Sequence, residues 1–121
     1  MKTTSFKGRD FLAETDFTRE EIETVLTVAE QLKKDRAMNN YHDQLLRSKT
    51  LFMIFYNQSL RTRNSFEAGM TQLGGHAHYL DPDKIYKPAL EGREIAYTTE
   101  RVSDVARVLD RMGDAIAIRC Y

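Results

Sequence analysis

The chain has 121 residues and carries 18 Lys and Arg against 18 Asp and Glu, so its formal net charge is zero. This length predicts one domain, and the neutral balance argues against a general nucleic-acid-binding protein. The sequence has no apolar run of the roughly 18 residues that a membrane span requires, and its single cysteine excludes an internal disulfide, so we expect a cytoplasmic protein that binds neither nucleic acid nor membrane.

The first predicted element is a helix over residues 19–38. Thr18 and Glu21 have the spacing of a capping box, in which each side chain accepts a hydrogen bond from the other residue's backbone N–H. Apolar residues then recur at helical spacing along the segment, and Asn39-Asn40 provides a stop.

A buried strand, a second helix and a second strand follow. Residues 50–56 form a short, continuously apolar run rich in aromatic side chains, which is typical of a strand covered on both faces in a parallel sheet. The pattern turns helical from Leu60, and Gly74-Gly75 ends this second helix. Residues 76–80 predict a second, shorter strand.

The last part of the chain begins with a predicted long loop over residues 81–97, which are polar, contain both prolines and lack a regular period. Thr98-Thr99 begins a third predicted helix, which runs to Gly113. Residues 115–118 predict a third buried strand that ends at Arg119. Strands that alternate with helices predict an α/β fold with a mainly parallel sheet flanked by helices.

The ends of the three predicted strands carry most of the polar residues of interest. In a parallel sheet the carboxyl ends of the strands meet at one edge, where ligands of such folds bind. Residues 57–62, 81–88 and 119–121 should therefore converge. The last strand is also the end of the sequence, which would leave a sheet edge unprotected, so we expect a chain that is cut short.

Residues 59–63, which read SLRTR, lie between the first strand and the second helix and suit an anion. The amides at a helix N-terminus and the helix dipole favour negative charge. Ser59 and Thr62 add hydroxyl groups, and Arg61 adds a guanidinium that can bind a phosphate through two parallel hydrogen bonds. The segment is neither a P-loop nor a dinucleotide-binding fingerprint, because the glycines of both motifs are missing.

The same residues have a simpler interpretation, which the spacing alone does not exclude. Ser59 could be an ordinary helix cap, and Arg61 and Arg63 could be solvated charges. Arg63 and Glu67 are four residues apart on the helix, so they could pair on its surface.

The wider sequence resembles a known family. Residues 55–67 read FYNQSLRTRNSFE and resemble the carbamoyl-phosphate signature of the aspartate/ornithine carbamoyltransferases. The segments QLGGHA (72–77), DVARVL (104–109) and DAIAIR (114–119) are also similar to this family, and within it to the ornithine and N-acetylornithine branch. The resemblance covers essentially the whole chain and implies that residues 1–121 are the N-terminal portion of the carbamoyl-phosphate-binding domain.

The resemblance implies roles by position. Arg119 matches a family arginine that helps to bind carbamoyl phosphate, and Arg63 matches a motif residue that we interpret as structural, through Glu67. Lys84 and Lys87 lie on a loop that reaches the neighbouring subunit's site in this trimeric family, although Lys87 stands where the N-acetylornithine enzymes have a tryptophan. The implied carbamoyl-phosphate-binding residues are Ser59, Leu60 (through backbone amides), Arg61, Thr62, Lys87 and Arg119, of which Arg61 and Arg119 are the catalytic ones.

The implied activity is ornithine-type carbamoyl transfer from carbamoyl phosphate to an amine, with no metal, covalent nucleophile or organic cofactor. The acceptor stays open among ornithine, N-acetylornithine, aspartate, putrescine and lysine-like amines. The family's His-Pro-x-Gln motif and its second, amino-acid-binding domain are absent, so we expect a fragment that is inactive alone. An alternative is a truncated homologue that acts as a regulatory or interaction subunit of a full-length carbamoyltransferase.

Three other residues have chemistry that such a site does not use. His76 and His78 could ligate a metal by their spacing, but no Cys or carboxylate is spaced to complete the set, so packing or exposure is favoured. Cys120 follows the last predicted strand, and we expect a buried thiol there.

Overall fold

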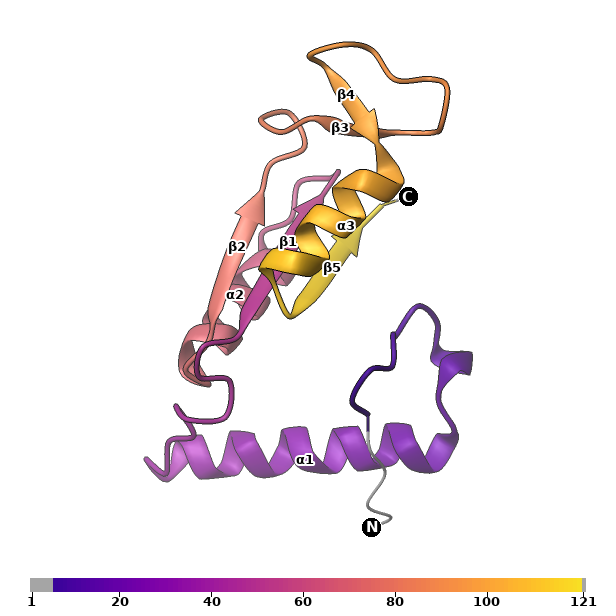
Figure 1. Cartoon of the computed structure of the whole chain (residues 1–121). Coiled ribbons are helices and arrows are strands. Elements are labelled where there is room, and N and C mark those ends of the chain that lie inside the picture. Colours follow the sequence, from indigo (N-terminus) through magenta and orange to yellow (C-terminus); the bar gives the residue numbers. More distant parts are fainter. Residues whose placement is uncertain (1–5, 121) are drawn as a thin grey trace. The chain divides into compact units, whose positions relative to one another are not determined.

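The computed structural model of the chain describes residues 6–120. The chain divides into two compact units, Met1–Tyr41 and His42–Tyr121, which Figure 1 shows in the colours of the sequence. No helix within the described range combines the length and the apolar character needed to cross a membrane. The assignment of all 121 residues to one domain stays a prediction.

The first unit contains a short 3₁₀ helix, η1 (Glu14–Asp16), and the long helix α1 (Arg19–Ala37). The predicted capping box is confirmed, because the Glu21 amide donates to Thr18 Oγ1 across 3.2 Å and the Thr18 amide donates to Glu21 Oε2 across 2.9 Å. The helix ends one residue before the predicted limit, and Asn39 follows in the left-handed region with a φ of 60°.

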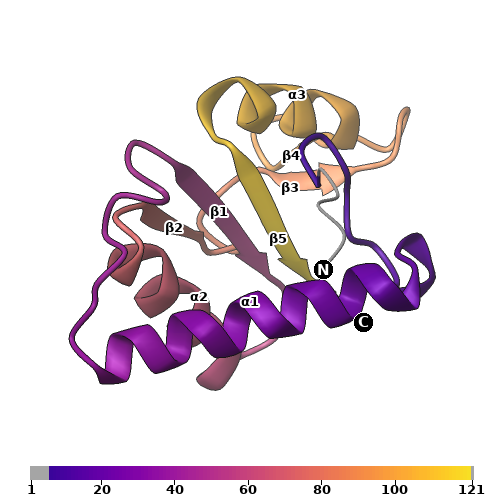
Figure 2. The ribbon, with the colours of Figure 1, turned by 90° about the horizontal axis from the view of Figure 1, so that it is seen from below.

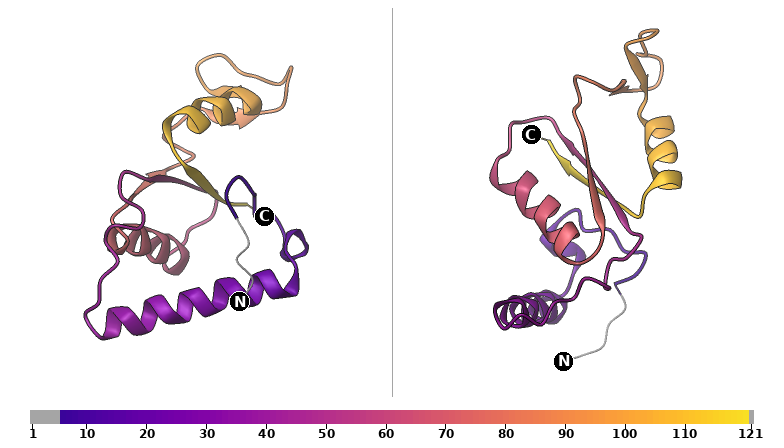
Figure 3. Two further views of the ribbon diagram at one scale, coloured as in Figure 1. Left: turned by 60° about the horizontal axis from the view of Figure 1, so that its bottom comes forward. Right: turned by 90° about the vertical axis from the view of Figure 1, so that its left-hand side faces the viewer.

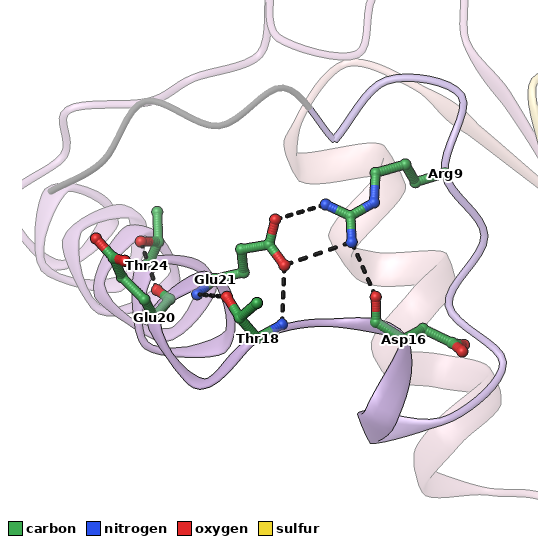
Figure 4. Close-up of polar contacts among 6 residues, drawn as sticks. All are labelled: Arg9, Asp16, Thr18, Glu20, Glu21 and Thr24. Atoms are coloured by element: carbon green, nitrogen blue, oxygen red, sulfur yellow. Dashed lines mark hydrogen bonds and ion pairs between the residues drawn. The ribbon is translucent and has the colours of Figure 1, made fainter.

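Arg9 ties the segment before α1 to the first turn of the helix (Figure 4). Its guanidinium donates to Glu21 Oε1 across 2.6 Å and to the Asp16 carbonyl across 2.9 Å, and it lies 4.3 Å from the ring centroid of Phe17. The hydrogen bond from Arg9, followed by that from the Thr18 amide, lowers the pKa of Glu21 to about 2. The carboxylate of Glu21 therefore serves the helix cap and the arginine together.

The second unit is built on a parallel sheet of β1 (Thr50–Phe55), β2 (His76–Leu80) and β5 (Ala115–Arg119), in the order β2-β1-β5. The predicted parallel sheet flanked by helices is confirmed. The predicted burial of the last strand is wrong, because β5 is an outer strand whose residues are exposed except for the half-buried Ala117. The central strand β1 has five consecutive buried residues, and Met53 is fully inaccessible. The strand is apolar over these five residues because both of its faces are covered.

Helices α2 (Arg61–Gln72) and α3 (Val102–Met112) lie on opposite faces of this sheet (Figures 2 and 3). On the α2 side, alternate residues of β1 form the core, with partners from α2 and the neighbouring strands: Leu51, Met53, Phe55, Met70, Ala77, Tyr79 and Ala117. On the α3 side, Ile54, Ile116 and Ile118 face Val105, Ala106 and Leu109 around an apolar cavity of about 130 Å³.

The predicted loop over residues 81–97 and the predicted start of the third helix are partly wrong. The structure has two short strands, β3 (Lys87–Ala89) and β4 (Thr99–Arg101), which pair in parallel, and α3 begins only at Val102. The Ile95 amide donates a hydrogen bond to Thr99 Oγ1, and this bond spans the turn that leads into β4. Strands of three residues carry too little periodicity to be distinguished from a loop, because their partners are distant in the sequence.

Candidate functional site

The carboxyl ends of β1, β2 and β5 meet at one edge of the sheet, as expected from parallel pairing (Figure 1). The ladder between β1 and β5 continues one residue beyond β1, because the Tyr56 amide donates to the Arg119 carbonyl across 3.0 Å. The segment between Tyr56 and the start of α2 is therefore held beside the end of β5.

The N-terminus of α2 has the features of an anion-binding helix end. Its cap residue, Leu60, has no side-chain oxygen and makes no side-chain capping bond, and the first turn contains no acidic residue. The N-terminus of α1 is the opposite case, since Thr18 caps it and Glu20 and Glu21 occupy its first turn. Uncapped amides and the helix dipole leave partial positive charge at the start of α2, which an external anion can neutralise.

Ser59 and Arg119 lie in direct contact at this corner. The Arg119 guanidinium donates from Nη1 to Ser59 Oγ across 2.9 Å, which joins residues that are 60 positions apart in the chain. Because the serine oxygen accepts this bond, its own proton is available to an acceptor beyond the pair. The guanidinium keeps further N–H groups for the same acceptor.

Arg61 and Arg63 have different surroundings although they are two residues apart. Arg63 is engaged on both sides, since its Nε lies 3.7 Å from Glu67 Oε2 and its guanidinium carbon lies 3.8 Å from the ring centroid of Tyr79. The expected pair with Glu67 is present. Arg61 is exposed and forms no ion pair with another residue in the range 6–120. Arg61 is thus the arginine of the motif that an anion could recruit.

Lys87 lies at the start of β3 and has a carboxylate partner of its own. Its ammonium group pairs with Asp83 Oδ1 at 2.8 Å, and this hydrogen bond raises the pKa of Lys87. It lines a pocket of about 490 Å³ with residues that follow β1 and β2, among them Tyr56, Asn57 and Asp81. The structure therefore brings Ser59, Leu60, Arg61, Thr62 and Arg119 together, whereas Lys87 contacts other partners.

Sequence reasoning missed two residues that contact the elements from which the corner is built. Tyr79 stacks on Arg63, and the alternation of β2, which sets Ala77 and Tyr79 on one face, is the signal that could have indicated it. Asp114 bonds to Lys49 and to the Thr50 amide at the start of β1. A polar residue directly before a predicted strand was the available signal.

The structure shows neither a metal site at the histidines nor a buried cysteine within residues 6–120. The rings of His76 and His78 are 6.1 Å apart, and His78 also packs on Phe52 at 5.6 Å. Residues 6–120 contain no group of three His, Cys, Asp or Glu side chains placed to hold a metal ion. The expectation of a buried thiol is wrong, because Cys120 is free and exposed. It follows β5, an outer strand of the sheet.

The chain resembles ornithine carbamoyltransferases over nearly all of its length. The enzyme of Halalkalibacterium halodurans is 48% identical over 118 residues, which are 98% of this chain and 34% of that protein. The enzyme of Pyrococcus abyssi is 44% identical over 117 residues, with 97% and 34% coverage. The chain thus spans about a third of the length of the curated relatives it matches.

Solved structures show the same relationship in three dimensions. Ornithine carbamoyltransferase from Pyrococcus furiosus superposes with a TM-score of 0.83 at 44% identity and covers 98% of this chain, which spans 34% of that protein. A variant of N-acetyl-L-ornithine transcarbamylase, crystallised with carbamyl phosphate and N-succinyl-L-norvaline, superposes with a TM-score of 0.80 at 36% identity, with 93% and 33% coverage.

A family model supplies the remaining evidence. The model described as "Aspartate/ornithine carbamoyltransferase, carbamoyl-P binding domain" matches residues 9–121, which is more than half of the chain. The matched range includes both helix N-termini compared above and all three strands of the parallel sheet. The chain therefore belongs to the aspartate/ornithine carbamoyltransferase family, whose carbamoyl-phosphate-binding domain it matches.

Proposed function

We propose that the corner between β1 and α2 binds carbamoyl phosphate and forms the phosphate-holding half of a carbamoyltransferase site. The observation that carries this proposal is the bond between Arg119 and Ser59, which brings a cation from β5 to the uncapped N-terminus of α2. Carbamoyl phosphate has a dianionic phosphate, which suits a helix N-terminus flanked by guanidinium groups.

In this proposal Ser59 and Thr62 donate hydroxyl hydrogen bonds to the phosphate, and the amides around Leu60 donate along the helix axis. Arg61, which is exposed and has no ion pair among residues 6–120, turns onto the phosphate oxygens. Arg119 contacts the corner from the other side and can also reach the carbamoyl oxygen. Arg63 stays on Tyr79 and Glu67 and supports the first turn of α2.

The proposed reaction transfers the carbamoyl group to an amine. The amine nitrogen attacks the carbonyl carbon, a C–N bond forms, the C–O bond to phosphate breaks, and the nitrogen gives up one proton. Negative charge grows on the carbonyl oxygen and on the departing phosphate, and the guanidinium groups of Arg61 and Arg119 stabilise it. Holding the two reactants together lowers the entropic part of the barrier.

The remaining assignments also belong to this proposal. We expect an ornithine-like acceptor, a homotrimer, a role in arginine biosynthesis and a cytoplasmic location for the active enzyme. Lys87 would act in the site of a neighbouring subunit, since in this chain it pairs with Asp83. We expect no turnover by the 121 residues alone, because about two thirds of each relative lies outside the match and the acceptor amine must be held as well.

Binding of carbamoyl phosphate to the 121-residue chain tests the proposal. Isothermal titration calorimetry should detect binding to the wild-type chain, with inorganic phosphate as a competitor. Arg61→Ala should weaken it at least tenfold, whereas Arg111→Ala, which removes an equal charge from the exposed last turn of α3, should not. Equal effects of the two substitutions, or no competition by phosphate, would contradict the proposal.

A further inference from the structure

Strand β5 has a short alternating sequence that defines its own register only weakly. Residues Ala115 to Ile118 read Ala-Ile-Ala-Ile, so the pattern repeats every two residues. Ala117 packs on the α2 side of the sheet, whereas Ile116 and Ile118 lie on the α3 side. A shift by one residue would exchange the two faces. A shift by two residues would keep the faces but would return Ala and Ile to only two of the four places, and Gly113 and Asp114, or Arg119 and Cys120, would enter the other two.

A two-residue shift would nevertheless destroy the corner described above. Each residue of a parallel strand rises by about 3.3 Å, so the shift would move Arg119 by about 6.6 Å along the sheet. The 2.9 Å bond from Arg119 to Ser59 could not survive this displacement. The alternation opposes such a shift only weakly, because β5 is an outer strand whose residues are largely exposed, so contacts at its ends can decide the position of Arg119.

Asp114, directly before β5, makes such contacts at the opposite end of the strand pair. Its Oδ1 accepts from Lys49 Nζ across 2.6 Å, and its Oδ2 accepts from the Thr50 amide across 2.9 Å. The Asp114 amide also donates to the Thr50 carbonyl across 2.9 Å. These three bonds, which we name the Asp114 bridge, join the start of β5 to the start of β1, and no carboxylate stands two residues before or after Asp114.

Two further observations support the Asp114 bridge. The hydrogen bond from Lys49, followed by that from the Thr50 amide, lowers the pKa of Asp114, so the carboxylate is ionised at neutral pH and both bonds are charge-assisted. The preceding residue, Gly113, lies against the buried ring of Phe52, where a Cβ would come within 2.5 Å of Cε2. A shifted chain would bring a residue with a side chain to this place.

We infer that Asp114 is a positioning residue, which selects the register of β5 and thereby sets Arg119 against Ser59. The importance of this register for carbamoyl phosphate rests on the proposed function. The register itself is a property of the sheet and does not depend on the proposed function. Asp114 acts at the far end of the strand from the ligand and contacts no reacting atom in this scheme.

Nuclear magnetic resonance of the 121-residue chain tests the inference, with Asp114→Ala, Asp114→Asn and the control Asp110→Asn. Asp110 is exposed on α3, so its substitution removes the same charge away from the bridge. The wild-type chain should show cross-strand contacts of Ile54 with Ile118, its register partner. In Asp114→Ala these contacts should weaken and contacts from Ile54 to Ile116 or Cys120 should appear.

The Asp114→Asn variant covers the case in which the alanine variant does not fold. Its amide oxygen can still accept from the Thr50 amide, but the charge pairing with Lys49 is lost, so we expect an intermediate loss of the wild-type contacts. Titration with inorganic phosphate should show binding about tenfold weaker for Asp114→Ala and unchanged for Asp110→Asn.

The two readouts separate the inference from the function on which it builds. If neither Asp114 variant changes the Ile54–Ile118 contact, Asp114 does not select the register and the inference is wrong. If the register shifts but the wild-type chain binds no phosphate, the proposed function fails while the role of Asp114 in the sheet stands.

Discussion

Arg119 and Ser59 are 60 residues apart in the chain, yet a 2.9 Å hydrogen bond joins the guanidinium of one to the hydroxyl of the other. The bond forms because β1 and β5 are parallel neighbours whose carboxyl ends coincide. It converts two ordinary polar residues into one group of donors beside the N-terminus of α2.

Substitution of Arg119 should weaken carbamoyl phosphate binding more than it changes folding. Arg119→Ala removes the guanidinium, and we expect a dissociation constant about tenfold higher or more, since hydrogen bonds to charged groups contribute about 1.5–3 kcal/mol. Arg119→Lys keeps the charge but not the planar fork, so it should recover only part of the affinity. Calorimetric titration measures both, and full recovery by lysine would contradict a bidentate role.

Substitution of Arg61 should lower the affinity for carbamoyl phosphate, whereas substitution of Arg63 should mainly lower the free energy of unfolding. Arg63→Ala removes the stacking on Tyr79, which we expect to cost about 0.5–1 kcal/mol in the free energy of unfolding, with a small change in affinity. Arg61→Ala should leave the unfolding transition in place and reduce the affinity for carbamoyl phosphate. Urea unfolding and calorimetry on the same samples measure the two effects, and a reversed order would contradict the assignment of Arg61 to the ligand.

The first turn of α1 should resist acid until Glu21 is protonated. The pKa of Glu21 is lowered to about 2 from an ordinary value of 4.5, so its contribution to stability is complete above pH 4.5 and is lost as the pH falls through about 2. Arg9→Gln removes the largest cause, so the loss should occur at a higher pH. The ¹³C shift of the Glu21 carboxyl group measures this, and Arg19→Gln, which removes a pair with Glu23 instead, is the control.

The capping box of α1 should contribute measurably to the free energy of unfolding of the helix. Thr18→Ala removes the oxygen that accepts from the Glu21 amide, and we expect a cost of about 1 kcal/mol. Thr27→Ala makes the same chemical change inside the helix, where Ala has the higher helix propensity, so it should be neutral or stabilising. Circular dichroism during urea unfolding compares the two, and equal losses would contradict a specific capping contribution.

Two glycines of the second unit should tolerate alanine differently. Gly113→Ala places a methyl group 2.5 Å from Cε2 of the buried Phe52 ring, and overpacking of this kind costs about 1–3 kcal/mol. Gly69→Ala lies within α2 with no described atom within 4 Å of the new Cβ, so it should stabilise the chain by about 0.5–1 kcal/mol. Thermal unfolding of both variants measures the two effects. An unchanged melting temperature for Gly113→Ala would contradict the predicted overpacking.

Local patterns in the sequence were sufficient for the long elements and for the family. The capping box at Thr18 and Glu21 and the continuous apolar run of β1 are formed by neighbouring residues, so their spacing alone predicts them. The SLRTR motif likewise predicted the helix start at which we propose an anion site. The three-residue strands β3 and β4 escaped prediction because each exists only through its pairing with the other.

The sequence by itself determined which residues are available at the corner and that residues 59–62 follow the buried strand β1. Only the tertiary structure decided the partners of two arginines: Arg119 bonds to Ser59, and Arg63 stacks on Tyr79. The exposure of Cys120 was also a tertiary outcome. The physical reason is that such contacts depend on strand order and register, and an alternating strand such as Ala-Ile-Ala-Ile is compatible with more than one register.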